Sequence, residues 1–132
     1  MPSPQSDQQA RGVLRAAFAE RGSSAPSLPE LQAAQAIGRF EGGDGKGWGQ
    51  AGAGSHNWGA VQCGHVAPCG PGCFEYGDSH ADGSGYRGCF KRYDSAVAGA
   101  GGLLHELYRR DGVPAALRQG DATAIASAMR KT

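Results

Sequence analysis

The sequence lacks several features that mark common functional classes. It contains no run of about 18 consecutive apolar residues, so we expect no membrane-spanning helix. The chain has thirteen basic and twelve acidic residues, which gives a net charge of +1. A surface that binds the phosphate backbone of nucleic acid needs a concentrated excess of basic residues, so we expect no nucleic-acid partner. The first residues, MPSPQSDQQA, lack the basic start and apolar stretch of a secretory signal. If the protein acts outside the cytoplasm, we expect another carrier to take it there.

Cysteine is absent outside one short region, which holds Cys63, Cys69, Cys73 and Cys89. Such clustering favours a local staple made of two disulfides. Four cysteines allow three pairings, and the sequence does not choose between them. In one of them the short loop between Cys69 and Cys73 lets these two pair, which leaves Cys63 to pair with Cys89.

Two alternatives use the same thiols. In the first, His65 or His80 joins them at a zinc site, although the irregular cysteine spacing is not a standard zinc pattern. In the second, Cys63 is the nucleophile of a cysteine peptidase with a nearby histidine as base. Such a thiol is often placed at a helix N-terminus, and the glycines and prolines after Cys63 disfavour a helix there. Disulfides therefore remain the favoured interpretation, and we expect no cofactor.

Glycine, in contrast, is abundant. The chain has 132 residues, of which 23 are glycine, so much of it must be turn and loop held on a small helical core. This length suits one domain. We expect a disordered lead over residues 1–6 and a single domain over 7–132, with a continuation beyond Thr132 because a helical pattern is interrupted there.

Periodicity and capping residues predict an α+β domain that is mainly helical. Apolar spacing predicts a helix from Asp7 to Gly22. A capping box of Ser27 and Glu30 predicts a second helix over 28–41. Residues 73–80 and 85–93, on either side of an Asp82–Gly85 turn, predict a β-hairpin.

The C-terminal third is predicted to be helical as well. Asp94 and Ser95 cap a helix that runs to about Arg110. A short turn over 113–120 then leads to a last helix that starts at Asp121, with Ile125 and Met129 facing inward.

The helix over 28–41 ends on a carboxylate in an unexpected place. Its residues divide into an apolar set of Ala33, Ala34, Ile37 and Phe40 and a polar set of Gln32, Gln35 and Arg39. At about 100° per residue, Glu41 projects only about 40° from Ile37, within the apolar set. Such surroundings disfavour the ionised carboxylate and raise its pKa, which suits a proton donor for glycosidic cleavage. The alternative is a helix-end glutamate whose side chain reaches water.

The order of features resembles the lysozyme superfamily. A helix ending in Glu41 is followed by a glycine-rich loop, by the segment SHNWGAVQ over 55–62, and by a hairpin. More narrowly, the chain is similar to bacterial and phage-type peptidoglycan glycosidases, the glucosaminidases and lytic transglycosylases. The family's groove motif, Ser/Asn-Asn-x-Gly-x-x-Gln, is matched here by Ser55, Asn57, Gly59 and Gln62, and Tyr93–Ser95 resembles its usual helix entry. The resemblance implies a lysozyme-like fold in which the hairpin borders the cleft and Glu41 is the general acid.

A second carboxylate is less clearly indicated. Asp78, within a hairpin arm, is the first choice, and Glu75 the next, whereas Asp82 is typical of a turn and Asp44 lies in the loop. Retaining and inverting glycosidases separate their two carboxyl groups by about 5 and about 6.5–9.5 Å respectively. The resemblance also allows a lytic transglycosylase, which needs no second carboxylate because a hydroxyl of the substrate closes onto the anomeric carbon.

Aromatic and amide side chains are the candidates for substrate binding. Flat rings stack on the apolar faces of sugars, and those available are Trp48, Trp58, Tyr76 and Tyr86. Core packing is the alternative, and it competes most strongly for Trp58. Ser55, Asn57 and Gln62 complete the groove; the amides either bind N-acetyl groups or hold loop backbone, and we expect Gln62 to tie the loop to Glu41.

The sequence therefore suggests an enzyme that cuts the glycan strands of peptidoglycan. The alternative is an inactive wall-glycan-binding or structural module of a phage tail or secretion apparatus. Either would act in the periplasm or at the cell wall, delivered by phage lysis or by a secretion machine. Muramidase, glucosaminidase and lytic transglycosylase activities remain open.

Overall fold

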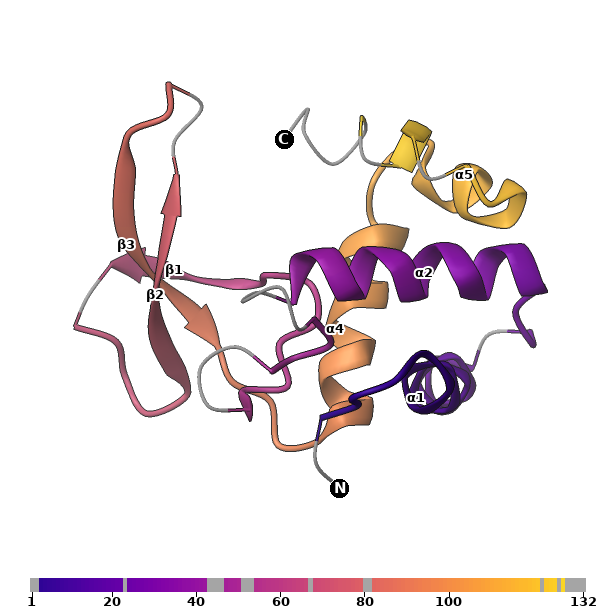
Figure 1. Ribbon diagram of the computed structural model, residues 1–132, viewed down its shortest axis with the longest axis horizontal. Helices are drawn as coiled ribbons and strands as arrows, with labels where there is room; N and C mark the ends of the chain where they lie inside the picture. The colour runs from indigo at the N-terminus through magenta and orange to yellow at the C-terminus, as the bar shows by residue number, and fades with distance from the viewer. Residues whose placement is uncertain are drawn as a thin grey trace.

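The chain forms a helical part and a small antiparallel sheet that lie at opposite ends of the molecule (Figure 1). The computed structural model describes residues 3–22, 24–42, 47–50, 54–66, 68–79, 82–121, 123–125 and 127, and for residues 65, 66, 78 and 79 the backbone alone. The elements are, in order, α1 (Asp7–Glu20), α2 (Leu28–Glu41), β1 (Gln62–Val66), β2 (Cys73–Ser79), β3 (Gly85–Lys91), α4 (Ala96–Tyr108) and α5 (Val113–Gln119). The expected α+β class is confirmed. None of the helices in this part of the chain combines the length and apolarity needed to cross a bilayer.

Local capping explains where the first two helices begin. The Ser6 side chain accepts a hydrogen bond from the Gln9 amide at the start of α1. The predicted capping box of Ser27 and Glu30 is present at the start of α2, because each side chain accepts from the other residue's backbone amide. Glu30 also accepts a hydrogen bond from the Tyr108 hydroxyl, which fastens this end of α2 to α4.

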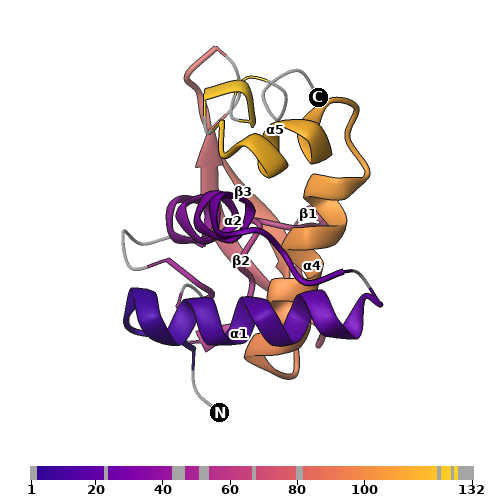
Figure 2. The same cartoon turned by 90° about the vertical axis from the view of Figure 1, so that its right-hand side faces the viewer.

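Helix α2 lies between α1 and α5, as the end-on view shows (Figure 2). Because neighbours cover more than one side of it, its buried residues do not form a single stripe. Gln35, expected on the polar side, is buried at 8% exposure, and Phe40, expected on the apolar side, is 81% exposed. Both placements were therefore wrong, and the reason is tertiary packing on two sides of the helix.

The core forms where α1, α2, α4 and α5 meet. Trp58 is its largest fully buried side chain, and Leu103 and Leu104 of α4 pack in the same cluster. Glycine permits the close approach: a Cβ at Gly38 would lie 2.9 Å from the Trp58 ring. The 55–61 segment can therefore run directly against α2 and α4.

The predicted hairpin is confirmed and is extended by a third strand. The strand order is β1-β3-β2, and both pairings are antiparallel, with Phe74 opposite Phe90 and Asp78 opposite Tyr86. At the tip, the Asp82 carboxylate accepts hydrogen bonds from the amide and hydroxyl of Ser84, at 2.9 and 2.6 Å. Asp82 is thus a turn residue, as expected.

Two disulfides fix the sheet, and their pairing is not the one that the sequence analysis considered. Cys63 of β1 pairs with Cys73 of β2, and Cys69, in the connection between these strands, pairs with Cys89 of β3. Of the three pairings that the sequence left open, the one with Cys69–Cys73 and Cys63–Cys89 is not found, because sheet register, which a spacing argument omits, decides which cysteines meet. A sheet of three short strands cannot bury a large core, so the covalent links replace packing.

Described residues near both ends of the chain make tertiary contacts. Ser3 is buried, and its hydroxyl donates to the Gly49 carbonyl. The segment expected to be a turn after residue 113 is the helix α5. Asp121 caps the next helical residues by accepting from the Ala124 amide, and Ile125 is buried as expected. Met129 lies outside the described residues.

Candidate functional site

Glu41 is the last residue of α2, as predicted, and the C-terminal end of α2 is directed toward the sheet (Figure 1). Its side chain is of intermediate exposure and does engage a partner, so it is neither fully solvated nor part of the packed core. Gly42 directly behind it is buried, and a Cβ there would collide with the backbone of residues 47 and 48. The chain is therefore tightly packed immediately after Glu41.

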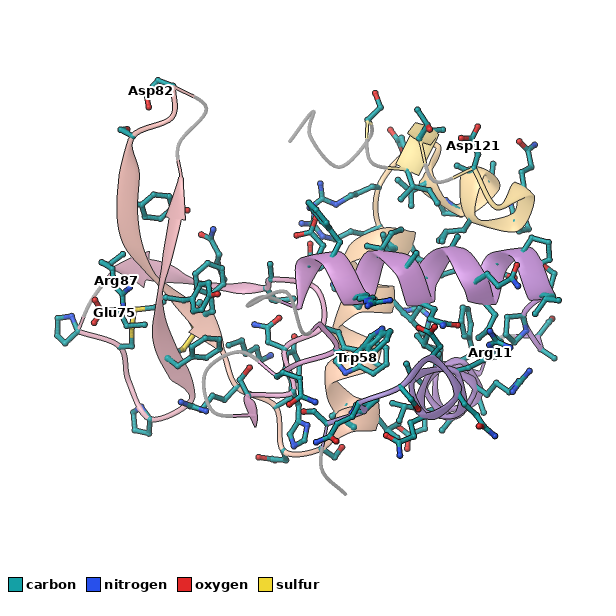
Figure 3. The ribbon with its side chains drawn as sticks, viewed as in Figure 1. Arg11, Trp58, Glu75, Asp82, Arg87 and Asp121 are labelled. Carbon is teal, nitrogen blue, oxygen red and sulfur yellow. A yellow bond between two sulfur atoms is a disulfide. The ribbon has the colours of Figure 1, made fainter. Side chains whose placement is uncertain are left out.

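The sheet presents two chemically different faces. Glu75 and Arg87 lie on the face that points away from the helices (Figure 3), where they form an exposed ion pair of 3.0 Å. Since successive side chains of a strand alternate between faces, Phe74 and Tyr76 project from the face toward the helical part. Phe74, Tyr76 and Phe90 contact one another there with ring centroids 6.0–6.2 Å apart.

Three of the predicted substrate-binding residues belong to this aromatic face. Tyr76 packs on Phe90 edge to face, and the Gln62 amide donates to the Tyr86 hydroxyl at 3.1 Å. The expected bond from Gln62 toward Glu41 is thus replaced by one to Tyr86. Gln62 is exposed and both tyrosines are partly exposed.

The other predicted groove residues serve the fold. Ser55, Asn57 and Trp58 are at most 3% exposed. The Asn57 side-chain amide donates to the carbonyls of Val61 and Lys91 and accepts from the Val61 amide, each at 2.9 Å. These three residues cannot reach a ligand in this structure, and loop support and core packing are the interpretations that describe them.

Trp48, expected to stack on sugar from the glycine-rich loop, is also largely buried, at 4% exposure. Its indole Nε1 donates to the Gln35 carbonyl at 3.0 Å, and its backbone amide donates to the Gly38 carbonyl at 3.0 Å. The backbone at residues 47–49 has positive φ throughout, which glycines allow at 47 and 49. The glycines therefore let the loop dock on α2 and insert the indole ring. Residues 43–46 and 51–53, including Asp44, lie outside the described part.

Glu75 and Asp78, the two carboxylates considered as partners of Glu41, are described to different extents by the structure. Glu75 is paired with Arg87 on the far face of the sheet, so it does not face the end of α2. A role for Glu75 as a second catalytic carboxylate is not favoured by this placement and stays a prediction. Asp78 pairs with Tyr86 in the strand register, and its side chain lies outside the described residues, so its role stays a prediction.

The zinc site and the cysteine peptidase considered above both need free thiols, which this structure does not contain. All four cysteines are in disulfides and none is free, so Cys63 cannot be a peptidase nucleophile in this state. The same bonds remove the thiolates from the suggested zinc site, whose histidines include His80, outside the described residues, and His65, described by its backbone alone.

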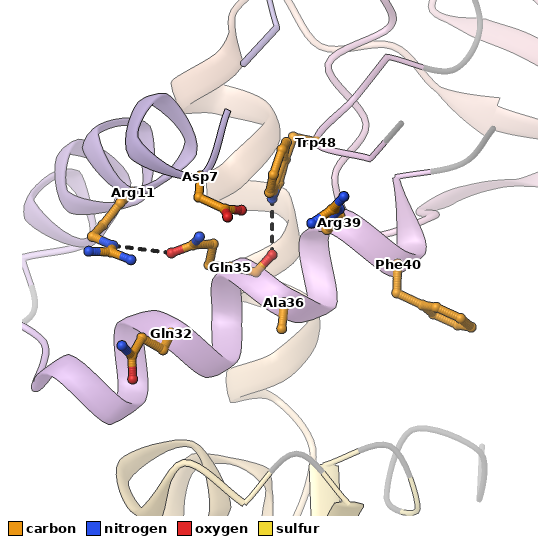
Figure 4. Close-up of a pocket in the computed structure, with 8 residues that line it drawn as sticks. All are labelled: Asp7, Arg11, Gln32, Gln35, Ala36, Arg39, Phe40 and Trp48. Carbon is orange, nitrogen blue, oxygen red and sulfur yellow. Dashed lines mark hydrogen bonds between the residues drawn. The ribbon is translucent and has the colours of Figure 1, made fainter. Parts of the chain in front are cut away.

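A pocket of about 700 Å³ lies between α1 and α2, beside Trp48 (Figure 4). Its lining consists of Asp7, Arg11, Gln32, Gln35, Ala36, Arg39, Phe40 and Trp48. Glu41 is not among these residues, because Arg39 projects about 200° from it around the helix. The residue periodicity had marked Gln32, Gln35 and Arg39 as one polar side, but gave no sign that α1 would approach and enclose it.

Comparison of the chain with protein-family models, with curated proteins and with solved structures finds no match. The chemistry of the site is therefore argued from this chain alone. The structure provides one carboxylate residue of intermediate exposure at the end of a helix, and this helix end is directed toward a sheet that carries Tyr76, Tyr86 and Gln62 on its facing side. Such an arrangement can bind a neutral polyhydroxylated ligand and can supply one proton.

Proposed function

We propose that the protein cleaves the glycan strands of peptidoglycan and that Glu41 is the general acid. The observation that supports this proposal is the position of Glu41, of intermediate exposure, as the last residue of α2, because this end of the helix is directed toward the sheet (Figure 1). A lysozyme-like arrangement of helix end and hairpin is part of the same proposal.

In this mechanism Glu41 acts as a carboxylic acid. It donates its proton to the oxygen that bridges two sugars while the bond from that oxygen to the anomeric carbon breaks. The positive charge that develops on the sugar ring is then quenched by water or by an internal nucleophile. Tyr76 and Tyr86 would support the sugar rings, and Gln62 would orient Tyr86 through their hydrogen bond.

The position of Glu75 bears on how the second half of the reaction proceeds. Because Glu75 faces away from α2 and is paired with Arg87, it is not the second carboxylate of this proposal. Two routes remain. Either Asp78 assists water or the sugar, or a hydroxyl of the substrate closes onto the anomeric carbon, as in lytic transglycosylases.

The products separate these routes. Purified sacculi are incubated with the full chain, and the soluble fragments are analysed by mass spectrometry. Anhydro-muramyl ends indicate a lytic transglycosylase, reducing muramic acid a muramidase and reducing glucosamine a glucosaminidase. Asp78→Asn should abolish either hydrolytic product, and it should leave anhydro-muramyl formation nearly unchanged.

The alternative is a wall-glycan-binding or structural module of a phage tail or secretion apparatus. The burial of Ser55, Asn57, Trp58 and Trp48 removes four expected groove residues from the surface, and this bears equally on glycan cleavage and on glycan binding. Co-sedimentation with sacculi and fragment release distinguish the two. Binding by the wild type without release of any fragment would establish the binding module.

The proposed site of action is the cell wall or the periplasm, reached through phage lysis or a secretion machine. The two disulfides support an oxidising compartment, because such bonds seldom persist in a reducing cytosol.

A further inference from the structure

The pocket between α1 and α2 has the size and lining of a ligand site. Its volume of about 700 Å³ falls within the range of small-molecule sites. It contains two amides, two guanidinium groups, one carboxylate and two aromatic rings (Figure 4). Because it lies on the side of α2 opposite Glu41, the proposed glycosidase reaction does not use it.

Two guanidinium groups in the pocket form no ion pair within the described part of the chain. Among the described residues no carboxylate lies within ion-pair distance of Arg11 or Arg39. Arg11 donates through Nε to the Gln35 side-chain oxygen at 3.2 Å, and the Arg39 guanidinium lies 5.7 Å from the centre of the Trp48 ring. Each guanidinium therefore keeps terminal N–H groups for a ligand, and the fork they form suits a carboxylate.

Asp7 also bears on which kind of anionic ligand the pocket can bind. Its carboxylate lines the same pocket and forms no ion pair with any described residue. With two arginines and one aspartate, the pocket offers partners of both signs, which suits a ligand with one carboxylate and one ammonium group, whereas phosphate would leave Asp7 without a cation. Asp7 also offers an acceptor for an ammonium group on the same ligand.

The remaining lining fits the body of a peptide. The Trp48 ring and the exposed Phe40 ring provide apolar walls. The Gln32 and Gln35 side chains provide amide groups that can pair with a peptide bond. Arg11 holds the buried Gln35 side chain in place, so part of this lining is fixed before any ligand arrives.

We propose that this pocket binds a short peptide that carries one free carboxylate and one free ammonium group. The carboxylate lies at Arg39, the ammonium at Asp7, and the Gln35 side chain that Arg11 holds faces the peptide bond (Figure 4). Peptides of this chemistry branch from peptidoglycan strands. That particular source rests on the proposed function, whereas the chemistry of the pocket does not.

The two tryptophans provide an internal readout of binding. The chain has two tryptophans, and only Trp48 lines the pocket, whereas Trp58 is fully buried in the core. In an NMR titration of the full chain with alanyl-alanine, the indole N–H signal of Trp48 should shift and saturate while that of Trp58 stays in place. N-acetyl-alanyl-alanine lacks the ammonium, alanyl-alanine amide lacks the carboxylate and alanine lacks the peptide bond, so each should bind about tenfold more weakly or worse.

Matched variants test the residues. Arg39→Gln and Asp7→Asn, both at exposed positions, should each weaken alanyl-alanine binding about tenfold, whereas Arg15→Gln, on the exposed side of α1 outside the pocket, should not change it. Arg11→Lys keeps the charge but loses the fork, and it should weaken binding as well. The Trp58 signal reports whether each variant is folded.

Three results would overturn this inference: no shift of Trp48 with alanyl-alanine, equal binding of the acetylated or amidated peptide, or preferential binding of inorganic phosphate. Glu41→Gln separates this site from the proposed reaction, because peptide binding should survive in that variant even if glycan cleavage is lost. Normal peptide binding by a protein that releases no glycan would refute the proposed function alone.

Discussion

Gly99 in α4 shows at the residue scale how little space separates the loops from the helices. A Cβ at this position would overlap the carbonyl oxygen of His56, whereas nothing lies within 4 Å of a Cβ at Gly101 in the same helix. The reason for glycine therefore differs between these two positions of the same helix. Gly99 is required by packing, and Gly101 only weakens the helix.

Alanine substitution distinguishes the glycine that packing requires from the glycine that only weakens the helix. Gly99→Ala should lower the free energy of unfolding by about 3 kcal/mol, because the backbone of residue 56 must move. Gly101→Ala should raise it by about 0.5–1 kcal/mol, since alanine is the better helix former. Denaturant unfolding monitored by circular dichroism measures both changes. Equal effects of the two substitutions would contradict the packing described around His56.

His56 itself should make stability depend on pH. Burial lowers the pKa of His56 below its ordinary value of 6.5, and its Nδ1 lies 3.0 Å from the Ser3 hydroxyl. The unfolded chain therefore binds a proton more readily than the folded chain does. The contribution of the uncharged His56 side chain to the free energy of unfolding is therefore fully present above about pH 6.5. This contribution is lost as the pH falls below that value.

The corresponding experiment compares unfolding at pH 7.5 and pH 5.5. The decrease in stability between these values should be smaller in His56→Asn, since asparagine does not titrate and tolerates the positive φ of 59° at this position. His105→Asn, at an exposed position of α4, is the control and should keep the wild-type decrease. An unchanged decrease in His56→Asn would show that other groups govern the pH dependence.

At the scale of elements, the helices and the sheet are held by different means. The helices bury a shared apolar core around Trp58, whereas the sheet has one aromatic cluster and two disulfides. Those bridges close loops with sequence separations of 10 and 20 residues. By chain entropy each contributes about 3 kcal/mol, so together they provide most of the order of the sheet.

Reduction should therefore loosen the sheet first. In hydrogen exchange with mass spectrometry, dithiothreitol should increase exchange in β1, β2 and β3 while α1 and α4 keep their protection. Cys69→Ser with Cys89→Ser should reproduce much of the effect without reductant. Uniform loss of protection in helices and sheet would mean that the disulfides hold the whole fold.

Elements defined by neighbours in sequence were predictable, and those defined by distant contacts were not. The Ser27 capping box, the Ser95 cap and the Asp82 turn are local hydrogen bonds, and all three are present. Helix α5 was missed because its short apolar set, Val113, Ala116 and Leu117, is recognisable only against α2. The disulfide pairing was not predictable for a similar reason, since it follows from the position of β3 between β1 and β2.

The candidate site was predictable to the same limited extent. The end of α2 at Glu41 follows from the capping box and the glycines, and it is where it was expected. The roles of Asn57 and Trp48 were not predictable, because a buried amide and a buried indole have the same sequence signature as ligand-binding ones. Arg11 and Arg39 come together only because α1 packs along α2.

At the scale of the whole molecule, α2 separates two regions of different chemistry. Its C-terminal end is directed toward the aromatic face of the sheet, and one of its sides lines the charged pocket against α1. A wall-degrading enzyme built in this way would cut glycan at the first region and hold an attached peptide at the second. Both proposals would then concern one substrate.

The number of new glycan chain ends formed per enzyme on purified sacculi tests the central claim most directly, measured for the wild type and for Glu41→Gln. The glutamine has nearly the same shape but cannot donate a carboxylic proton, so end formation should fall about 100-fold or more while binding to sacculi persists. Glu20→Gln, at the exposed last residue of α1, is the matched control and should retain the wild-type activity. Equal numbers of new ends from the wild type and Glu41→Gln, or none from the wild type, would contradict the assignment of Glu41 as the general acid.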